Sequence, residues 1–308
     1  MDMKKIAGVI VTYNRKDLLK RCLDAVASQT FKPHTVFITD NASTDGTIDS
    51  VKEWGYFECL RDGIEYKYVL NPKNEGGAGG FYLGMKTAYE QGVFDGIWVM
   101  DDDGVPDRDC LRLLAEHLPS RDYISPFVLS IENPEVGFGL ARPKYADMLA
   151  KYSSGLFEGG AAPFNGILYS SRLIKEIGFP KRDMFIWGDE SNYHLRAIKA
   201  GMPPVTIMAA KHLHPYNRQA IFKHNNCDYV DIDADWKLYC CLRNKWYNTL
   251  HFSEHNIVRR SLSVVYEALR YTMAYKEIKR RNISSLTIDA LFCAFLGKFD
   301  RLNFYKKN

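Results

Sequence analysis

The chain has 308 residues, 46% of them apolar and 25% charged, a composition that supports a buried core and excludes a disordered protein. The net charge of +4 is uneven, because residues 259–308 hold eleven Lys or Arg against four Asp or Glu. Seven scattered cysteines without CxxC spacing argue against a disulfide framework or a zinc site and for a reducing compartment. With no signal peptide and no apolar run near the roughly 18 residues of a membrane span, we expect a cytoplasmic protein.

The first third of the chain alternates between predicted strands and predicted helices. β-Branched runs ending in polar residues predict the strands, and apolar residues at helical spacing predict the helices. The strands cover residues 5–14, 34–47, 65–72 and 96–104, and the helices cover residues 15–29, 47–54 and 80–92. This alternation predicts an α/β fold with a mostly parallel central sheet and a site at the carboxyl ends of its strands.

The pattern changes after residue 120. Prolines and glycines punctuate an irregular middle, and helices are predicted at residues 171–177 and 190–200. From residue 235 the pattern is helical almost to the end. We therefore expect a domain of residues 1–220 followed by a helical C-terminal region of residues 221–308.

The segment NEGGAGGF at residues 74–81 places four glycines within five positions. The dinucleotide motif G-x-G-x-x-G does not fit, because its third glycine would fall on Tyr82, and no Walker lysine follows. One interpretation is a flexible turn that caps a helix. The other is that bare backbone lets a diphosphate or a sugar approach the amides at a helix N-terminus.

Three adjacent carboxylates, Asp101, Asp102 and Asp103, follow the apolar strand at residues 96–100. They repel one another, and a divalent cation relieves that repulsion, although in isolation the three acids could also form a solvated turn or a helix cap. Alternation at a strand end places Asp101 and Asp103 on one side and turns Asp102 away. We expect Mg²⁺ or Mn²⁺ here, bridging a nucleotide diphosphate.

These segments together carry a family resemblance. VIVTYNR, FITDNAST, NEGGAGGF and MDDD resemble the inverting glycosyltransferases of family 2, which have the GT-A fold. NEGGAGGF with MDDD is similar in particular to bacterial galactofuranosyltransferases that use UDP-galactofuranose. The resemblance covers roughly residues 5–215 and implies a GT-A domain with a helical extension.

The resemblance also implies roles for single residues. Arg15 would contact a diphosphate oxygen, Asp40 the uracil imide, and Asp103 the metal ion. The residues implied in donor binding are Thr12, Arg15, Asp40, Asn74, Gly76, Gly77, Gly79, Gly80, Asp101 and Asp102. Phe164 and Asn165 would form an acceptor wall.

Downstream, DMFIWGDESNYHLRAIKAG at residues 183–201 resembles the family's acidic catalytic segment. The resemblance makes Glu190 the preferred base, but the family commonly has Asp there, so Asp189 stays an alternative. Helix-capping acids are a further reading. The family keeps a metal-binding histidine about twenty residues later, which His214 matches better than His212.

The implied reaction is metal-dependent, inverting transfer of galactofuranose from UDP-galactofuranose to a glycan or lipid-linked glycan, in the synthesis of a surface polysaccharide such as O antigen. A rhamnosyltransferase that uses dTDP-rhamnose is the rival of the same class. A non-catalytic sugar-nucleotide-binding partner and a nucleotidyltransferase are the rivals from other classes.

The C-terminal segment interleaves aromatic and basic residues. An apolar face with basic flanks would lie on an anionic membrane surface, or it packs into a core or a dimer. The face comprises Phe292, Phe295, Leu296 and Phe299, and its flanks comprise Lys298, Arg301, Lys306 and Lys307. Arg243 and Asn244, in a preceding helix, are expected to face the acceptor. No nucleic-acid-binding motif is present, so nucleic acid is not an expected partner.

Overall fold

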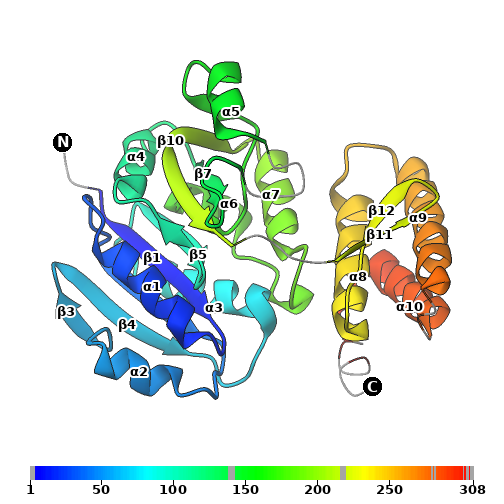
Figure 1. The fold of residues 1–308 in the computed structure, drawn as a ribbon, viewed down its shortest axis with the longest axis horizontal. Helices are drawn as coiled ribbons and strands as arrows, with labels where there is room; N and C mark the ends of the chain where they lie inside the picture. The colour runs from blue at the N-terminus through cyan, green and yellow to red at the C-terminus, as the bar shows by residue number, and fades with distance from the viewer. Residues whose placement is uncertain are drawn as a thin grey trace. The chain divides into compact units, whose positions relative to one another are not determined.

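The computed structural model describes residues 4–137, 143–215, 220–278, 280, 282–300, 302 and 305. These residues form two compact units (Figure 1). The first unit comprises Met1–Arg182 and Arg196–Asn217, and the second comprises Asp183–Leu195 and Arg218–Asn308. Helix α7 (Asp189–Lys199) therefore begins in the second unit and ends in the first.

A ten-stranded mixed sheet forms the framework of the first unit, with the order β3-β4-β2-β1-β5-β9-β7-β10-β6 and β8 paired with β10. Its strands are β1 (Ile6–Thr12), β2 (Thr35–Asp40), β3 (Cys59–Arg61), β4 (Ile64–Leu70), β5 (Gly96–Asp101), β6 (Val105–Pro106), β7 (Tyr123–Ser130), β8 (Leu156–Glu158), β9 (Asn165–Ser170) and β10 (Val205–His214). Strands β4, β2, β1 and β5 pair in parallel, as do β7 and β10, whereas β9 runs antiparallel between β5 and β7. The register places Thr12 beside Asp40 and Val11 beside Asp101, so the polar strand ends meet at one edge.

Helices cover both faces of this sheet because β1 is apolar on both of its faces. Ile6 and Ile10 belong to the core that α1, α2 and α4 cover, whereas Val9 and Val11 face α3. This fits a parallel strand that is buried on both sides. The helices of the first unit are α1 (Lys16–Ala27), α2 (Thr47–Glu53), α3 (Gly76–Glu90), α4 (Cys110–His117), α5 (Tyr145–Lys151) and α6 (Ser171–Ile177). The 3₁₀ helix η1 (Arg182–Met184) begins at the last residue of the first segment of this unit and continues into the second unit.

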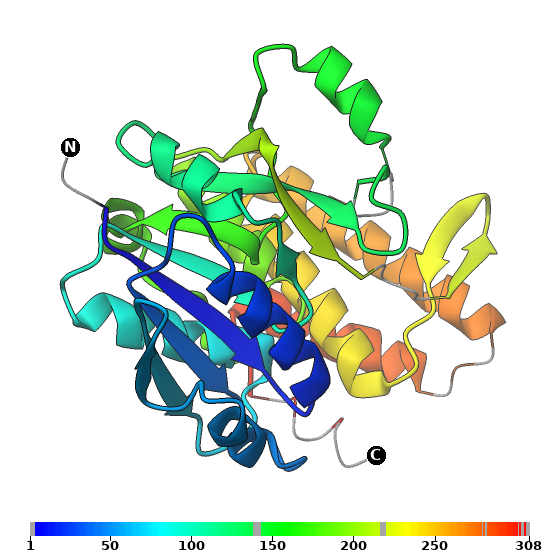
Figure 2. The same ribbon diagram turned by 60° about the vertical axis from the view of Figure 1, so that its left-hand side comes forward.

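The second unit is built on three helices and a hairpin. These elements are α8 (Asp235–Phe252), α9 (Ile257–Glu277), α10 (Ile283–Leu296), β11 (Ile221–His224) and β12 (Cys227–Val230). The three helices lie side by side (Figures 1 and 2) around a core that includes Leu238, Trp246 and Leu286. No helix in the described part of the chain is long and apolar enough to cross a membrane.

The outer sides of α9 and α10 expose many large apolar side chains. On α9 these are Ile257, Val258, Leu262, Val265, Tyr266, Leu269 and Met273, and on α10 they are Ile288, Phe292, Phe295 and Leu296. Phe299 departs from the expected apolar face, because its half-buried ring packs against Tyr247 and under the guanidinium of Arg243. Of the expected basic flanks, Lys298 is exposed, whereas Arg301, Lys306 and Lys307 lie outside the described residues.

Candidate functional site

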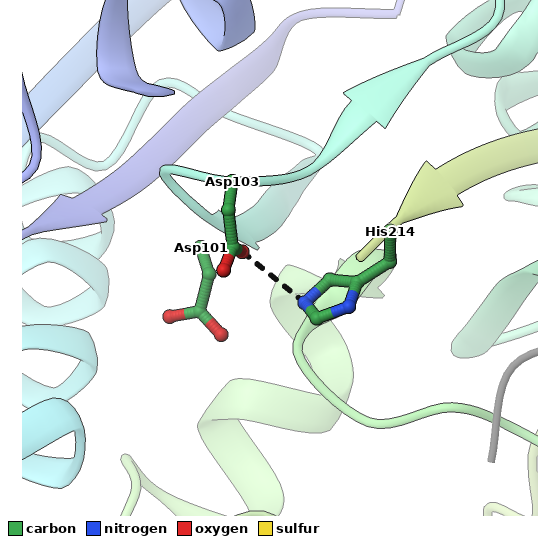
Figure 3. A group of neighbouring side chains, drawn as sticks. All are labelled: Asp101, Asp103 and His214. Atoms are coloured by element: carbon green, nitrogen blue, oxygen red, sulfur yellow. Dashed lines mark ion pairs between the residues drawn. The ribbon is translucent and has the colours of Figure 1, made fainter. Parts of the chain in front are cut away.

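Asp101, Asp103 and His214 form a group whose ligand atoms all lie within 4.8 Å of one another (Figure 3). Asp101 ends β5, and the chain then turns into β6, which pairs antiparallel with the end of β10. This turn brings Asp103 against His214, with 3.1 Å between Oδ1 of Asp103 and Nε2 of His214. Among the described residues this is the one group of three or more such side chains that could hold a metal ion.

The charges in this group are coupled. Burial and the neighbouring Asp103 raise the pKa of Asp101 to about 7, although Arg15 opposes the change. Burial also acts to raise the pKa of Asp103, but the hydrogen bond to His214 outweighs it and the pKa is lowered. The same bond raises the pKa of His214 against the effect of burial. Two crowded carboxylates and an imidazole are a donor set that a divalent cation fits.

Asp102 is fully buried and is not part of the group that could hold a metal ion. Its Oδ2 accepts a hydrogen bond of 2.7 Å from the Thr12 hydroxyl, and its Oδ1 lies 2.6 Å from Nη2 of Arg15. Arg15 also binds Asp103, at 2.8 Å through Nη1, and its side chain stays 42% exposed. Thr12 therefore orients an acid instead of presenting its hydroxyl to a ligand, whereas Arg15 borders solvent.

His212 does not join the metal-binding group. Its ring is fully buried, and neither ring nitrogen has a hydrogen-bond partner among the described residues. A Cβ built on Gly104 would lie 2.3 Å from Nε2 of this ring, and one on Gly166 would lie 2.6 Å from Nδ1. Burial and the nearby His214 lower the pKa of His212 to about 3. The ring is a neutral packing element between two glycine backbones, so His214 is the histidine of the candidate metal site.

Asp40 and the following Asn41 end β2 beside the glycine segment. The Asp40 carboxylate, almost fully buried, accepts hydrogen bonds from the Tyr68 hydroxyl and, at 2.8 Å, from the Ser43 amide. Asn41 was not among the sequence candidates, yet its Nδ2 donates to the Gly76 carbonyl at 2.8 Å.

Asn41 is the centre of the hydrogen-bond network that holds the entry into α3. Its Nδ2 also lies 3.1 Å from Oδ1 of Asn74, and its Oδ1 accepts from Glu75 N and Asn71 Nδ2 at 3.1 and 3.0 Å. Asn74 in turn accepts a bond of 2.8 Å from the Gly76 amide. The one feature of the sequence that could have identified Asn41 was its position directly after Asp40.

The structure gives a different reason for glycine at each position of this segment. Gly76 has a φ of +70°, a conformation that favours glycine. A Cβ on Gly80 would lie 2.4 Å from Cγ1 of Val11, and one on Gly79 would lie 2.3 Å from Cβ of Glu75. A Cβ on Gly77 would meet no described atom within 4 Å. The expectation that every glycine of the run opens space for a ligand is therefore corrected at Gly79 and Gly80, where a Cβ would clash within the fold, whereas Gly77 leaves open backbone.

Asp189 and Glu190 form the first turn of α7 and lie in the second unit. Asp189 is 4% exposed, and Glu190 Oε2 accepts a hydrogen bond of 2.9 Å from the Gly188 amide. The Glu190 carboxylate thus satisfies an amide that precedes the helix, as a capping acid does. One of its two oxygens remains outside that bond.

Phe164 and Asn165 do not form an exposed wall. Phe164 is 3% exposed, has a φ of +60°, and stacks on Phe81 with ring centroids 4.4 Å apart. Asn165 donates from Nδ2 to the Pro163 carbonyl at 2.9 Å. The expected stacking of a sugar on Phe164 is corrected, because its ring is already packed inside the first unit.

Comparisons with known proteins bear on the family and the fold of the chain. Residues 9–173 match the family model described as glycosyl transferase family 2. The chain is 34% identical to galactofuranosyltransferase GlfT1 of Mycolicibacterium smegmatis over 222 residues. The aligned region covers 68% of this chain and 70% of that protein.

Two solved structures share the fold at lower identity. The chain superposes on S. aureus TarS with a TM-score of 0.54 and 15% identity, over 98% of this chain and half (50%) of the length of that one. It superposes on mannosyltransferase PcManGT from Pyrobaculum calidifontis, solved with GDP-Man and Mn²⁺, with a TM-score of 0.55 and 14% identity, over 99% of this chain and 88% of that one.

Proposed function

The chain belongs to glycosyltransferase family 2 and is a glycosyltransferase with the GT-A fold, and on that basis we propose that it transfers galactofuranose from UDP-galactofuranose to a glycan hydroxyl. The observation that carries the donor assignment is the 34% identity to a galactofuranosyltransferase over 68% of the chain. A relative of that identity and coverage favours a shared donor over the rival dTDP-rhamnose.

Asp101, Asp103 and His214 are the residues that would hold Mn²⁺ or Mg²⁺. Both metals accept carboxylate oxygens, and the imidazole favours Mn²⁺ of the two. The solved mannosyltransferase, which contains Mn²⁺ with GDP-Man, supports the same choice. When bound, the cation supplies positive charge that offsets the negative charge on the departing diphosphate.

The donor would lie over the carboxyl ends of β1, β2 and β5. The side chain of Arg15 borders solvent and is paired with Asp103. If a metal ion neutralised Asp103 instead, the guanidinium of Arg15 could bind a diphosphate oxygen. Asp40 would accept from the uracil imide, and the open backbone at Gly77 would allow close approach of the donor.

Glu190 is the proposed base, with Asp189 as the alternative. The carboxylate takes the proton of an acceptor hydroxyl while that oxygen attacks the anomeric carbon. The new C–O bond forms on one face of the anomeric carbon while the bond to the β-phosphate oxygen breaks on the opposite face. The electron pair of the broken bond stays with that oxygen, and UDP leaves. The configuration inverts, through an oxocarbenium-like transition state, and no covalent sugar–enzyme bond is needed.

We further propose that residues 1–220 act as the transferase domain and that residues 221–308 contact a lipid-linked acceptor at an anionic membrane surface. The exposed apolar sides of α9 and α10 fit the hydrocarbon boundary of such a surface. Residues 259–308 contain eleven basic and four acidic residues, and this positive charge favours binding to anionic lipid head groups.

Mass spectrometry of a synthetic galactose-terminated lipid acceptor tests the reaction. UDP-galactofuranose, UDP-galactopyranose and dTDP-rhamnose are supplied separately, each with Mn²⁺ and with EDTA. We expect one hexose to be added from the furanose donor alone, and only with Mn²⁺. Transfer of rhamnose would overturn the donor, and donor binding without turnover on a wider acceptor panel would favour a non-catalytic partner. Release of pyrophosphate would indicate a nucleotidyltransferase.

The base is tested with Glu190→Gln and Asp189→Asn. We expect Glu190→Gln to lower turnover by about 10²–10⁴-fold with UDP binding retained, since the amide cannot take the proton. The Gln oxygen can still accept from the Gly188 amide, so the turn is preserved. Unchanged turnover in both variants would show that neither acid is the base.

A further inference from the structure

The turn that leads into α7 has a demanding backbone conformation. Phe185, Trp187 and Gly188 have φ angles of +68°, +56° and +94°. For a non-glycine residue such an angle is strained, and it persists where surrounding contacts enforce it. The acid pair Asp189 and Glu190 directly follows this turn, so whatever enforces the turn also sets the direction of the pair.

The contacts that enforce the turn come from Asn244 on α8. Its Nδ2 lies 3.0 Å from the carbonyl oxygen of Met184, 3.0 Å from that of Ile186 and 2.6 Å from that of Trp187. Its Oδ1 accepts a bond of 2.9 Å from Nε of Arg243. Asn244 and Arg243 are fully buried, which corrects the expectation that they face an acceptor.

Asn248, one helical turn further along α8, completes the clamp. Its Nδ2 donates to the Gly188 carbonyl at 2.8 Å, and its Oδ1 accepts from Nδ2 of Asn192 in α7 at 3.0 Å. A Cβ on Gly188 would lie 2.8 Å from Cβ of Asn244, so the turn passes α8 at a distance that favours glycine. The two asparagines therefore contact the carbonyls of Met184, Ile186, Trp187 and Gly188, and Asn248 also holds the first turn of α7 through Asn192.

We infer that Asn244 and Asn248 are positioning residues for glycosyl transfer, fixing the turn before α7 so that the carboxylate of the base meets the acceptor hydroxyl. This inference rests on the proposed function. Neither asparagine is a catalytic residue, because each acts through backbone carbonyls. A misplacement of a catalytic group by about 1 Å can cost about a hundredfold in rate, so loss of the clamp lowers kcat and leaves donor affinity unchanged.

The test is Asn244→Asp, which keeps the shape of the side chain and replaces its N–H donors by an oxygen that faces carbonyl oxygens. We expect kcat to fall by about tenfold to a hundredfold, with calorimetric binding of UDP in Mn²⁺ unchanged. Hydrogen exchange should rise in residues 185–190. Asn256→Asp is the matched control, because Asn256 caps α9 through a bond of 2.9 Å from the Arg259 amide and Asp caps equally well.

A wild-type kcat in Asn244→Asp would overturn the inference, as would a folded variant that loses UDP binding to the same extent as kcat. If Asn244→Asp does not fold, Asn248→Asp removes only the bond to Gly188 and carries the same expectation. If the wild-type protein transfers no sugar, the proposed function fails, but exchange still decides the clamp. An increase confined to residues 185–190 supports the clamp, and unchanged exchange overturns it.

Discussion

Two histidines separated by one residue on β10 have different environments. His214 meets Asp101 and Asp103 at the strand end, whereas His212 is enclosed between Gly104 and Gly166. We expect His214→Ala to weaken Mn²⁺ binding at least about tenfold in calorimetry, because it removes a nitrogen ligand. His212→Ala should leave Mn²⁺ affinity intact and cost about 2–4 kcal/mol of stability through the cavity it creates. Equal Mn²⁺ affinities in the two variants would contradict the assignment.

The raised pKa of Asp101, about 7 against an ordinary 3.8, predicts opposite pH dependences for metal binding and for stability. Between these values Asp101 keeps a proton in the folded metal-free protein that it loses in the unfolded chain, so the contribution of Asp101 to stability falls as pH rises towards 7. His212, whose pKa is lowered to about 3, contributes with the opposite sign below 6.5, so the effect of Asp101 is the difference between the wild type and Asp101→Asn. Mn²⁺ requires the deprotonated carboxylate and a neutral His214, so its affinity rises over the same range. Calorimetric titration and thermal unfolding at pH 5 to 8 check both signs. A flat Mn²⁺ affinity would show that Asp101 is not a ligand.

At the scale of elements, two glycines of α3 differ in their surroundings: Gly80 packs closely on the sheet, whereas Gly77 faces open space. Gly80→Ala pushes a methyl group to 2.4 Å from Val11 Cγ1, which should cost about 1–3 kcal/mol in urea unfolding. Gly77→Ala meets open space and should stabilise the helix by about 0.5–1 kcal/mol. If the donor lies against this backbone, Gly77→Ala nevertheless weakens binding of UDP-galactofuranose. Equal stabilities for the two variants would contradict the packing argument.

The strands and helices of the first third of the chain could be predicted because their apolar periods are clear. Strands β7 and β9 were missed, since the prolines and glycines from Pro126 to Pro163 suggested an irregular middle, and β10 was not predicted either. Pro126 pairs with Ile207, where a bulge interrupts the register of β10, so the missing N–H falls at a break in the ladder. Such a tertiary compensation leaves no local pattern in the sequence.

The site was predictable where its chemistry is adjacent in the sequence, as for Asp101 and Asp103. The parts of the site in which asparagine side chains hydrogen-bond to distant segments were not predictable. Asn41 and Asn244 carry no charge pattern, and their partners in other segments lie 30 to 60 residues away. Thr12 and Phe164 were placed near the right elements, but their side chains serve neighbours in the fold.

At the scale of the whole molecule, charge and exposed apolar surface coincide in the C-terminal helices. We expect the protein to sediment with phosphatidylglycerol vesicles more than with phosphatidylcholine vesicles, and less as salt rises above about 0.1 M. Leu262→Glu, on the exposed side of α9, should reduce this binding. Leu60→Glu is the matched control, because Leu60 is 77% exposed on β3, outside those helices. Equal loss in both variants, or no binding by the wild type, would contradict a membrane-facing role.

The division of the chain also has a consequence for synthesis. Asp183–Leu195 belongs to the unit whose other residues begin at Arg218, so the acid pair belongs to a part of the fold that is completed late. During translation from the N-terminus, α8 emerges about fifty residues after the turn it clamps. The sheet and the Asp101–Asp103–His214 group can form before the base is fixed. If Glu190 is the base, we expect a nascent chain halted before α8 to bind Mn²⁺ at Asp101, Asp103 and His214 and to lack transferase activity, because the turn before Glu190 is not yet fixed.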